Sequence, residues 1–468
     1  MAAKGVALIC SCIVGAALSQ VAEGQTPSAQ AYETDAPGGS HAPLVLTVPG
    51  PSPDRWAFPL TEADQHLPSW IQFGGQFRNR WEYAGGIDYG LLNDGYNLTQ
   101  LRLGMYVRPV KWFEIVAVTE DSRVFFNQHI PSRPPYEETW DIREAYARIG
   151  SDTEGIADLV VGRELFSFGD ERVIGPSDWS NMGRTFDTVR FDLHPRNANI
   201  SIFAASVINA LNDGIAHHIE GNNLYGIYSS FRKLVPAAVL EPYLLWRVAP
   251  GNISLPETAG RGAMSEVTGG ARIAGTIRAG FDYDVEMNKQ TGSLGHYTID
   301  AWAGHWNLGK TFSDVPGKPR PFVEYNYATG NRNPLSNTWT THDQIYASSH
   351  DKMDFADQFG WRNIKDIRAG VMQKVAKRWE FTELANNLWL ATKNDAVYSS
   401  SGEISIAAHP NATSTHLGTE LDLIGTFNQN AHISYGFGFA YLFPGAFLKQ
   451  ATPGKDYKYP FAYVTYVF

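Results

Sequence analysis

Apolar and polar residues alternate along many segments of this chain. In residues 71–83 the odd positions include Phe73, Phe77 and Trp81, whereas Gln, Arg and Glu fill most even positions. A period of two is typical of a β-strand with one apolar face and one polar face. The alternation therefore predicts an all-β protein. It recurs in residues 97–109, 188–194, 276–287, 322–330, 419–427, 431–443 and 460–468.

The length of these segments indicates which solvent meets the apolar face. They run about nine to eleven residues, which is what a tilted strand needs to cross a membrane. Turn-forming residues separate them, and aromatic residues gather near their ends, as interfacial girdles require. We therefore expect lipid on the apolar face and an interior on the polar face. A slip of one residue would put Arg78 and Arg80 into hydrocarbon at ~2–4 kcal/mol each, so we expect a firmly set register.

The extent of the alternating region predicts the size of the barrel. About 400 residues, at roughly 22–25 residues per strand and connection, give 16 to 18 strands, an even number as in bacterial barrels. The expected fold is a transmembrane antiparallel β-barrel of 18 strands, with 16 as the alternative. Barrels of this size leave a water-filled lumen. A secreted β-sandwich or propeller also alternates, but its strands are shorter, at roughly 5–6 residues.

Composition agrees with strands and turns in an exported protein. Aromatic residues make up 13% of the chain, there are 44 Gly, and charged residues are only 18%. The formal net charge of −10 argues against nucleic acid as a partner. Both cysteines, Cys10 and Cys12, lie in the leading apolar segment. After cleavage the chain would contain neither a disulfide nor a cysteine metal site.

Three regions follow one another along the sequence. Residues 1–24 combine Lys4, a short apolar run and small residues suited to cleavage, which predicts a signal peptide. Residues 25–69 are rich in Pro, Ala and Ser and are expected to form a periplasmic lead-in. Residues 70–468 are the barrel. Their ending on Phe468 looks like the final strand through which bacterial outer-membrane proteins engage their assembly machinery.

Five stretches together resemble the alginate export family of outer-membrane porins. The resemblance covers most of the barrel region, with matching order and spacing. It implies a monomeric 18-stranded barrel in the lipid of the Gram-negative outer membrane, which passes an anionic uronate polymer outward. The stretches are WDIREAYARIG (140–150), residues 159–192 beginning LVVGRELFSF, YNYATGNRNP (325–334), residues 341–371 beginning THDQIYASSH, and HLGTELDLIGTF (416–427).

Arginines on the polar faces are the candidate solute path. A pore for a polyanion needs many weak positive sites, and arginine stays protonated and offers a planar fork to a carboxylate. The candidates, taken by face or by the resemblance, are Arg78, Arg80, Arg102, Arg108, Arg143, Arg163, Arg190, Arg247, Arg278, Arg332 and Arg368, with Lys374. The acids expected to hold them are Glu82, Asp282, Asp284, Glu286, Glu324, Glu420 and Asp422.

Two features qualify this set. Arg163 shares its face with apolar residues, which indicates either a bulge or a position near a strand end. The alternative interpretation of the whole set is that its charges form ladders that only rigidify the barrel, because ion pairs of that kind also fill barrel interiors.

The segment 330–366 is too polar and irregular to be strand throughout. We expect a large external loop that folds over the mouth of the barrel. Its Asp and His residues raise the hypothesis of calcium binding, with a solvated loop as the simpler interpretation. Trp179 with Arg184, and Trp361 with Arg362, are candidates for stacking on sugars and binding their carboxylates.

Three functions stay open from the sequence. The first is a passive, anion-selective porin that exports an acidic polysaccharide such as alginate, without cofactor or resident metal. The second is an uptake porin for small sugars, organic acids or other small anions. The third is an outer-membrane enzyme or adhesin with a filled barrel. The sequence contains no nucleophile elbow, HExxH motif or phosphate loop, so no catalytic residue is assigned and an enzyme is not expected.

Overall fold

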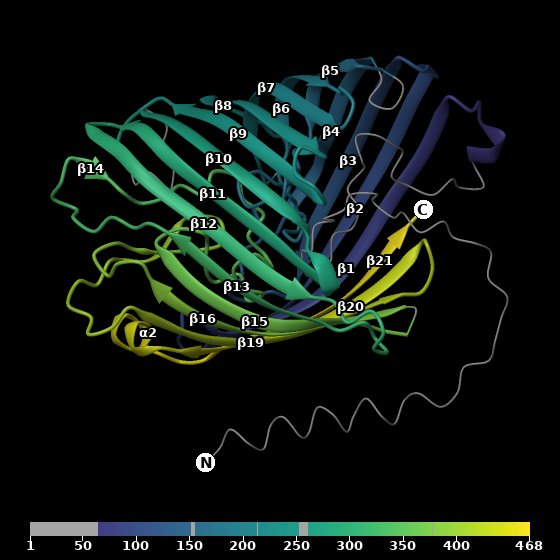
Figure 1. Cartoon of the computed structure of the whole chain (residues 1–468). Coiled ribbons are helices and arrows are strands. Elements are labelled where there is room, and N and C mark those ends of the chain that lie inside the picture. The colour runs from purple at the N-terminus through teal and green to yellow at the C-terminus, as the bar shows by residue number, and fades with distance from the viewer. Residues whose placement is uncertain (1–63, 151–154, 213, 252–260, 377) are drawn as a thin grey trace, which may run out of the picture. The chain divides into compact units, whose positions relative to one another are not determined.

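The chain folds into a closed antiparallel β-barrel. The computed structural model describes residues 64–150, 155–212, 214–251, 261–376 and 378–468. In these ranges 18 strands pair in succession, and β1 (Ile71–Ile87) closes the ring against β21 (Tyr457–Val467) (Figure 1). The predicted fold and strand number are confirmed. The predicted signal peptide and residues 25–63 of the lead-in lie outside the described ranges.

The strands follow one another around the ring in chain order. Short elements outside the barrel strands are η1 (Asp64–His66), which precedes β1, and, in the connections, η3 (Arg278–Gly280), β14 (Thr338–Trp339), β17 (Val397–Tyr398), β18 (Ile404–Ile406) and α2 (Ala446–Ala451). No helix in the described part of the chain is long and apolar enough to cross a membrane. The other barrel strands are β2 (Leu92–Val110), β3 (Phe113–Phe125), β4 (Glu138–Gly150), β5 (Ala157–Glu164), β6 (Phe186–Leu193), β7 (Ala198–Asn209), β8 (His217–Arg232), β9 (Ala238–Ala249), β10 (Met264–Thr276), β11 (Phe281–Leu294), β12 (Tyr297–Lys310), β13 (Arg320–Ala328), β15 (Ile364–Val375), β16 (Trp379–Leu390), β19 (His416–Asn428) and β20 (Ile433–Pro444).

The connections differ in length between the two ends of the barrel. At the end where β1 begins and β21 finishes, strands are joined by short turns such as 111–112 and 194–197. At the opposite end lie long connections, including 165–185 and 329–363. Outer-membrane barrels have short periplasmic turns and longer extracellular loops. We therefore place the short-turn end in the periplasm and the long-loop end outside.

Side-chain burial follows the predicted alternation. On β1, Phe73 and Trp81 are 45% and 51% exposed, whereas Arg78 and Arg80 are only 3% and 2% exposed. The apolar residues thus face lipid and the arginines face inward, as the register argument required. The strands are longer than predicted: β1 has 17 residues and β2 has 19. Their ladder continues toward the long-loop end through Gly and Asn, where the apolar pattern that marks a membrane strand stops.

Two loops fold into the interior of the barrel. The 165–185 loop and the 329–363 loop bury Phe166, Ile174 and Phe355 in one hydrophobic cluster with wall residues such as Phe203 and Leu384. Since these side chains are dry and packed together, the expectation of a wholly water-filled lumen is wrong for this structure. The inward strand faces are polar, but the two loops carry their own apolar core into the space between them.

The outcome for the segment 330–366 follows from this folding. Asp343, Asp351, Asp354 and Trp361 are each at most 5% exposed. The expectation of a solvated external loop is therefore wrong from about residue 341 onward. Irregular backbone is tolerated inside a barrel because buried wall groups satisfy its polar atoms.

A glycine lies at the seam where the barrel closes. The N–H of Gly75 donates to the carbonyl oxygen of Phe468 at 2.7 Å, and the N–H of Phe468 donates back at 2.9 Å. A Cβ on Gly75 would lie 2.5 Å from the Phe468 ring and 2.7 Å from the carbonyl oxygen of Arg102. The backbone oxygen cannot move aside without disturbing the ladder.

We predict that Gly75→Ala lowers the free energy of unfolding by about 1–3 kcal/mol, because the added methyl group overpacks the seam. Urea titration of the refolded barrel, followed by tryptophan fluorescence, measures the change. Gly269→Ala is the control, since its Cβ would meet Leu244 at an ordinary 3.7 Å. Equal unfolding midpoints for the two variants would contradict the prediction.

Candidate functional site

Arginines on β1 bind the backbone of the 165–185 loop. Arg78 donates from Nη1 to the carbonyl oxygen of Asp178 at 2.8 Å and from Nη2 to that of Ser180 at 2.9 Å. Arg80 donates from Nη1 to the carbonyl oxygen of Trp179 at 2.6 Å. Each of these bonds spans about a hundred residues of sequence. They fix the loop against the inner wall.

The carboxylate of Asp178 completes this attachment. It accepts from Arg102 Nη2 at 3.0 Å and from Arg143 Nη2. Arg143 also donates from Nη1 to the carbonyl oxygen of Met182 at 2.8 Å. Burial raises the pKa of Asp178, but Arg143, Arg102 and Arg78 together outweigh burial and hold that pKa below its usual value. The carboxylate is therefore charged at neutral pH, and it binds strands β2 and β4 to the loop.

A second group of charges fastens both inner loops to the opposite wall. Glu324 on β13 pairs with Arg172 at 3.0 Å and with Arg368 at 3.2 Å. Arg368 Nη1 also donates to the carbonyl oxygen of Lys352 at 2.8 Å. The Lys352 ammonium lies 3.5 Å from Asp170, and with Arg172 it holds the pKa of Asp170 below its usual value despite burial. The Glu324 carboxylate on the wall thus binds one arginine from a strand and one from a loop.

The two inner loops also pair with each other. Ile174 and Tyr346 form a parallel β-bridge. The N–H of Gly175 donates to the Tyr346 carbonyl oxygen at 2.9 Å, and the N–H of Tyr346 donates to the Val173 carbonyl oxygen at 3.0 Å. Arg184 Nη1 donates to the same Tyr346 oxygen at 2.5 Å. The loops therefore form one assembly inside the barrel.

Most of the sequence-predicted residues lie on the inner face. Their guanidinium groups act chiefly as attachments for loops and neighbouring strands. Whether they also line the solute path is a matter for the proposed function. The inward arginines are Arg78, Arg80, Arg102, Arg108, Arg143, Arg190, Arg247 and Arg368, and the inward acids are Glu82, Asp282, Asp284, Glu286, Glu324, Glu420 and Asp422.

Arg278 does not lie on an inward strand face. It is exposed in the turn between β10 and β11, where Ala279 (φ 64°) and Gly280 (φ 78°) take positive φ values. The sequence pattern continued the alternation through this turn because Ile277 and Phe281 happen to keep the period. Lys374 is also exposed, and it pairs with Glu380 at 2.9 Å.

Arg163 lies one residue from the end of β5. Its poor fit to the alternation indicated either a bulge or a position near a strand end, and the structure shows the second. It shares the outward side of the strand with Val161, which is 46% exposed, and its Nε donates to Asp187 at 3.0 Å. Arg332 is exposed in the 329–363 loop, where Nη2 donates to the Tyr327 hydroxyl at 3.4 Å. Neither residue faces the interior.

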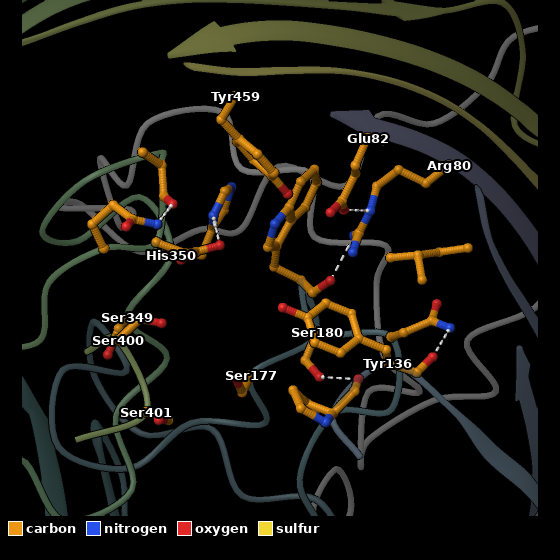
Figure 2. Close-up of a pocket in the computed structure, with 18 of the residues that line it drawn as sticks. Arg80, Glu82, Tyr136, Ser177, Ser180, Ser349, His350, Ser400, Ser401 and Tyr459 are labelled. Atoms are coloured by element: carbon orange, nitrogen blue, oxygen red, sulfur yellow. Dashed lines mark hydrogen bonds and ion pairs between the residues drawn. The ribbon is translucent and has the colours of Figure 1, made fainter. Parts of the chain in front are cut away.

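A cavity of about 300 Å³ remains between the inner loops and the β1–β21 wall. In its lining, the Arg80 guanidinium lies 3.9 Å from the centre of the Trp179 ring, and the His350 ring stacks on Trp179 at 4.1 Å. Figure 2 shows Arg80 and Glu82 together on one side of this cavity. Other residues that line it are Tyr96, Tyr136, Ser177, Arg184, Ser349, Ser400, Ser401, Tyr457 and Tyr459.

This cavity combines charge, ring faces and hydroxyl groups.

A family model described as "Alginate export" matches residues 69–461. The chain belongs to the alginate export family. Family membership and fold together identify this alginate export family member as an outer-membrane β-barrel channel. The family and the fold are both typical of channels rather than of enzymes.

Solved structures similar to this alginate export family member are porins of Pseudomonas aeruginosa. OpdK with vanillate has a TM-score of 0.58 and 9% identity, over 85% of this chain and 98% of that one. OccD3 (OpdP) has a TM-score of 0.56 and 11% identity, over 86% and 92%. OpdQ has a TM-score of 0.58 and 10% identity, over 85% and 98%. At these identities the likeness concerns the fold. No curated protein matches the chain in sequence.

Metal binding finds little support in the interior. Among the residues that the structure places, the only cluster of three His or carboxylate ligands close enough to share an ion is Asp170, Asp284 and His305. Its carboxylates already pair with cations, Asp170 with Lys352 and Asp284 with Arg272 at 2.5 Å. The group does not include the Asp residues of 330–366 that raised the calcium hypothesis.

Several buried charged residues that hold the interior together escaped the sequence prediction. Arg272 and Arg320 lie on inner faces of β10 and β13, and the alternation of those strands could have identified them. Asp178, Arg172 and Lys352 lie in loops, where no periodicity tells which way a side chain points. They bind to partners far away in sequence, so only the closed fold reveals them.

We predict that Asp178→Asn loosens the 165–185 loop. Removing one partner of a buried ion pair costs about 3–5 kcal/mol, and here it leaves Arg102 and Arg143 short of a counter-charge. Hydrogen exchange in 165–185 should accelerate, and single-channel conductance in planar bilayers should rise and become noisier.

The matched control is Asp187→Asn, because Asp187 pairs with Arg163 on the outer side of the barrel and its side chain is 35% exposed. That variant should exchange and conduct like the wild type. If Asp178→Asn also behaves like the wild type, the carboxylate does not hold the loop.

Proposed function

We propose that this protein is an anion-selective channel of the Gram-negative outer membrane that exports an acidic polysaccharide such as alginate. Family membership supports the class of solute. The observation that carries the proposal is the cavity beside Trp179, where guanidinium groups, aromatic ring faces and serine hydroxyls converge in the channel interior. Transport is passive and needs no cofactor.

The chemistry of the cavity suits a uronate residue. A sugar ring presents C–H groups that pack on an aromatic face, and Tyr136 and Tyr459 supply such faces. Its carboxylate needs a cation, and Arg80 and Arg184 border the space. Arg184 Nη1 donates to the backbone carbonyl oxygens of Gly175, Tyr346 and Ala347.

Anion preference must arise locally, because the interior as a whole is not basic. Buried carboxylates outnumber buried arginines and lysines in the described part of the chain. Most of the inward arginines are paired with these acids, as in the Glu324 group. Arg80 is likewise paired with Glu82. In this proposal selectivity is set where the path passes Arg80 and Arg184, since the potential along the path matters and the sum of charges does not.

Uptake of small organic acids is the second candidate. The specific observation in its favour is the filled interior: the inner loops are bound to the wall, and the cavity of about 300 Å³ has the size of a small solute rather than of a polymer strand. The fold is shared with OpdK, whose structure holds vanillate. Export of a polymer would require the two loops to move together.

We predict an anion-selective reversal potential for the wild type in planar bilayers under a salt gradient. Replacing Arg80 and Arg184 by Gln should lower the anion-to-cation permeability ratio roughly two- to tenfold for each charge, as expected for a partly screened charge ~10 Å from the ion path. Arg123→Gln is the control, because Arg123 pairs with Asp121 and is partly exposed on the outward side of β3. A cation-selective wild type would refute the proposal.

Block of the current by uronate chains separates the two candidates. For an exporter, the dwell time of a blocking event should grow with chain length, and Tyr136→Ala should shorten it about two- to tenfold by removing one ring contact. Trp140→Ala, on a side chain 53% exposed in β4, should leave the dwell time unchanged. Equal block by the monomer and by longer chains would favour uptake of small acids.

A further inference from the structure

A second polar cavity lies on the outer side of the barrel wall. It has a volume of about 440 Å³ and is bordered by β11, β12, β13 and the first part of the 329–363 loop. Lys289 and Trp302 line it and are exposed, whereas their neighbours Gln290, Ala301 and Ala303 are completely buried. Since side chains alternate along a strand, Lys289 and Trp302 point away from the interior.

The cavity lies at the edge of the lipid-facing band. Lys289 pairs directly with Trp302 across the β11–β12 ladder. Toward the short-turn end the next outward side chain on β11 is Met287, 47% exposed, and Leu308, 45% exposed, lies further along the outward face of β12. Toward the long-loop end the next outward residue on β12 is Asp300, which is exposed. This step from apolar to charged, marked by a tryptophan, is the depth of the outer-leaflet headgroups.

The lining offers the groups that a phosphorylated sugar needs. Lys289 and Arg332 supply two cations. The Lys289–Asp300 ion pair is more than half exposed on both sides, so it is weak and open to exchange for another anion. The Trp302 and Tyr327 rings pack 4.6 Å apart and give an aromatic surface. Amide and hydroxyl groups from residues 329–340 complete the wall.

We propose that this cavity binds the headgroup of a phosphorylated glycolipid in the outer leaflet of the membrane. Phosphates would meet Lys289 and Arg332, and the sugar would lie against Trp302. The apolar wall below Trp302 would carry the acyl chains, which a free phosphate or sugar lacks. The transported solute is not the occupant, because the cavity lies on the opposite side of the barrel wall from the channel interior.

The test uses the full-length protein in detergent, titrated with a diphosphorylated, acylated glucosamine disaccharide and followed by native mass spectrometry. Wild type should retain one glycolipid at this site, and the double variant Lys289→Gln/Arg332→Gln should bind it at least about tenfold more weakly for each lost charge-assisted contact. Lys458→Gln, an exposed outward lysine on β21, is the matched control and should bind like wild type.

Two further arms decide the identity of the ligand. The dephosphorylated glycolipid should bind wild type at least about tenfold more weakly, and inorganic phosphate should not displace the intact one. Equal retention by wild type and the double variant would overturn the proposal. So would equal binding of the dephosphorylated probe, which tests the wild type alone and does not depend on how the variant folds. Displacement by phosphate would overturn the assignment to a lipid.

Discussion

The attachment of two inner loops to the barrel wall by buried arginines is the interaction on which the interior of this protein depends. Arg78 and Arg80 donate hydrogen bonds to the backbone of the 165–185 loop, and the Asp178 carboxylate of that loop pairs with Arg102 and Arg143 on the wall. Buried guanidinium groups are stable only when several acceptors surround them. The wall supplies the cations and the loops supply carbonyl and carboxylate oxygens, so neither part reaches this arrangement without the other.

This arrangement changes how a porin interior should be interpreted. In a barrel of 18 strands, inward arginines are naturally taken as a coating for passing anions. Here most of the inward arginines form ion pairs or hydrogen bonds that hold the wall and the loops together, as the pairs of Glu324 with Arg172 and Arg368 illustrate. A cavity of about 300 Å³ remains beside Trp179. Any anion preference therefore has to come from side chains that also hold the interior together.

The sequence was a good guide wherever a strand imposed its period. The alternation in residues 71–83 placed Arg78 and Arg80 inside, because a one-residue slip would expose both to hydrocarbon. It failed at Arg278, where Ile277 and Phe281 kept the period across a turn. It also could not place Asp178 or Lys352, since loop residues have no period and their partners lie on distant strands. The folding of 341–363 into the lumen had no local signal for the same reason.

The β-bridge between Ile174 and Tyr346 has a consequence for how the interior can rearrange. Backbone pairing couples the two loops through hydrogen bonds that are either made or broken, with little in between. One loop therefore cannot withdraw gradually while the other stays behind. Widening of the passage would proceed as a single cooperative step, and current traces would jump between discrete levels instead of drifting through a continuum.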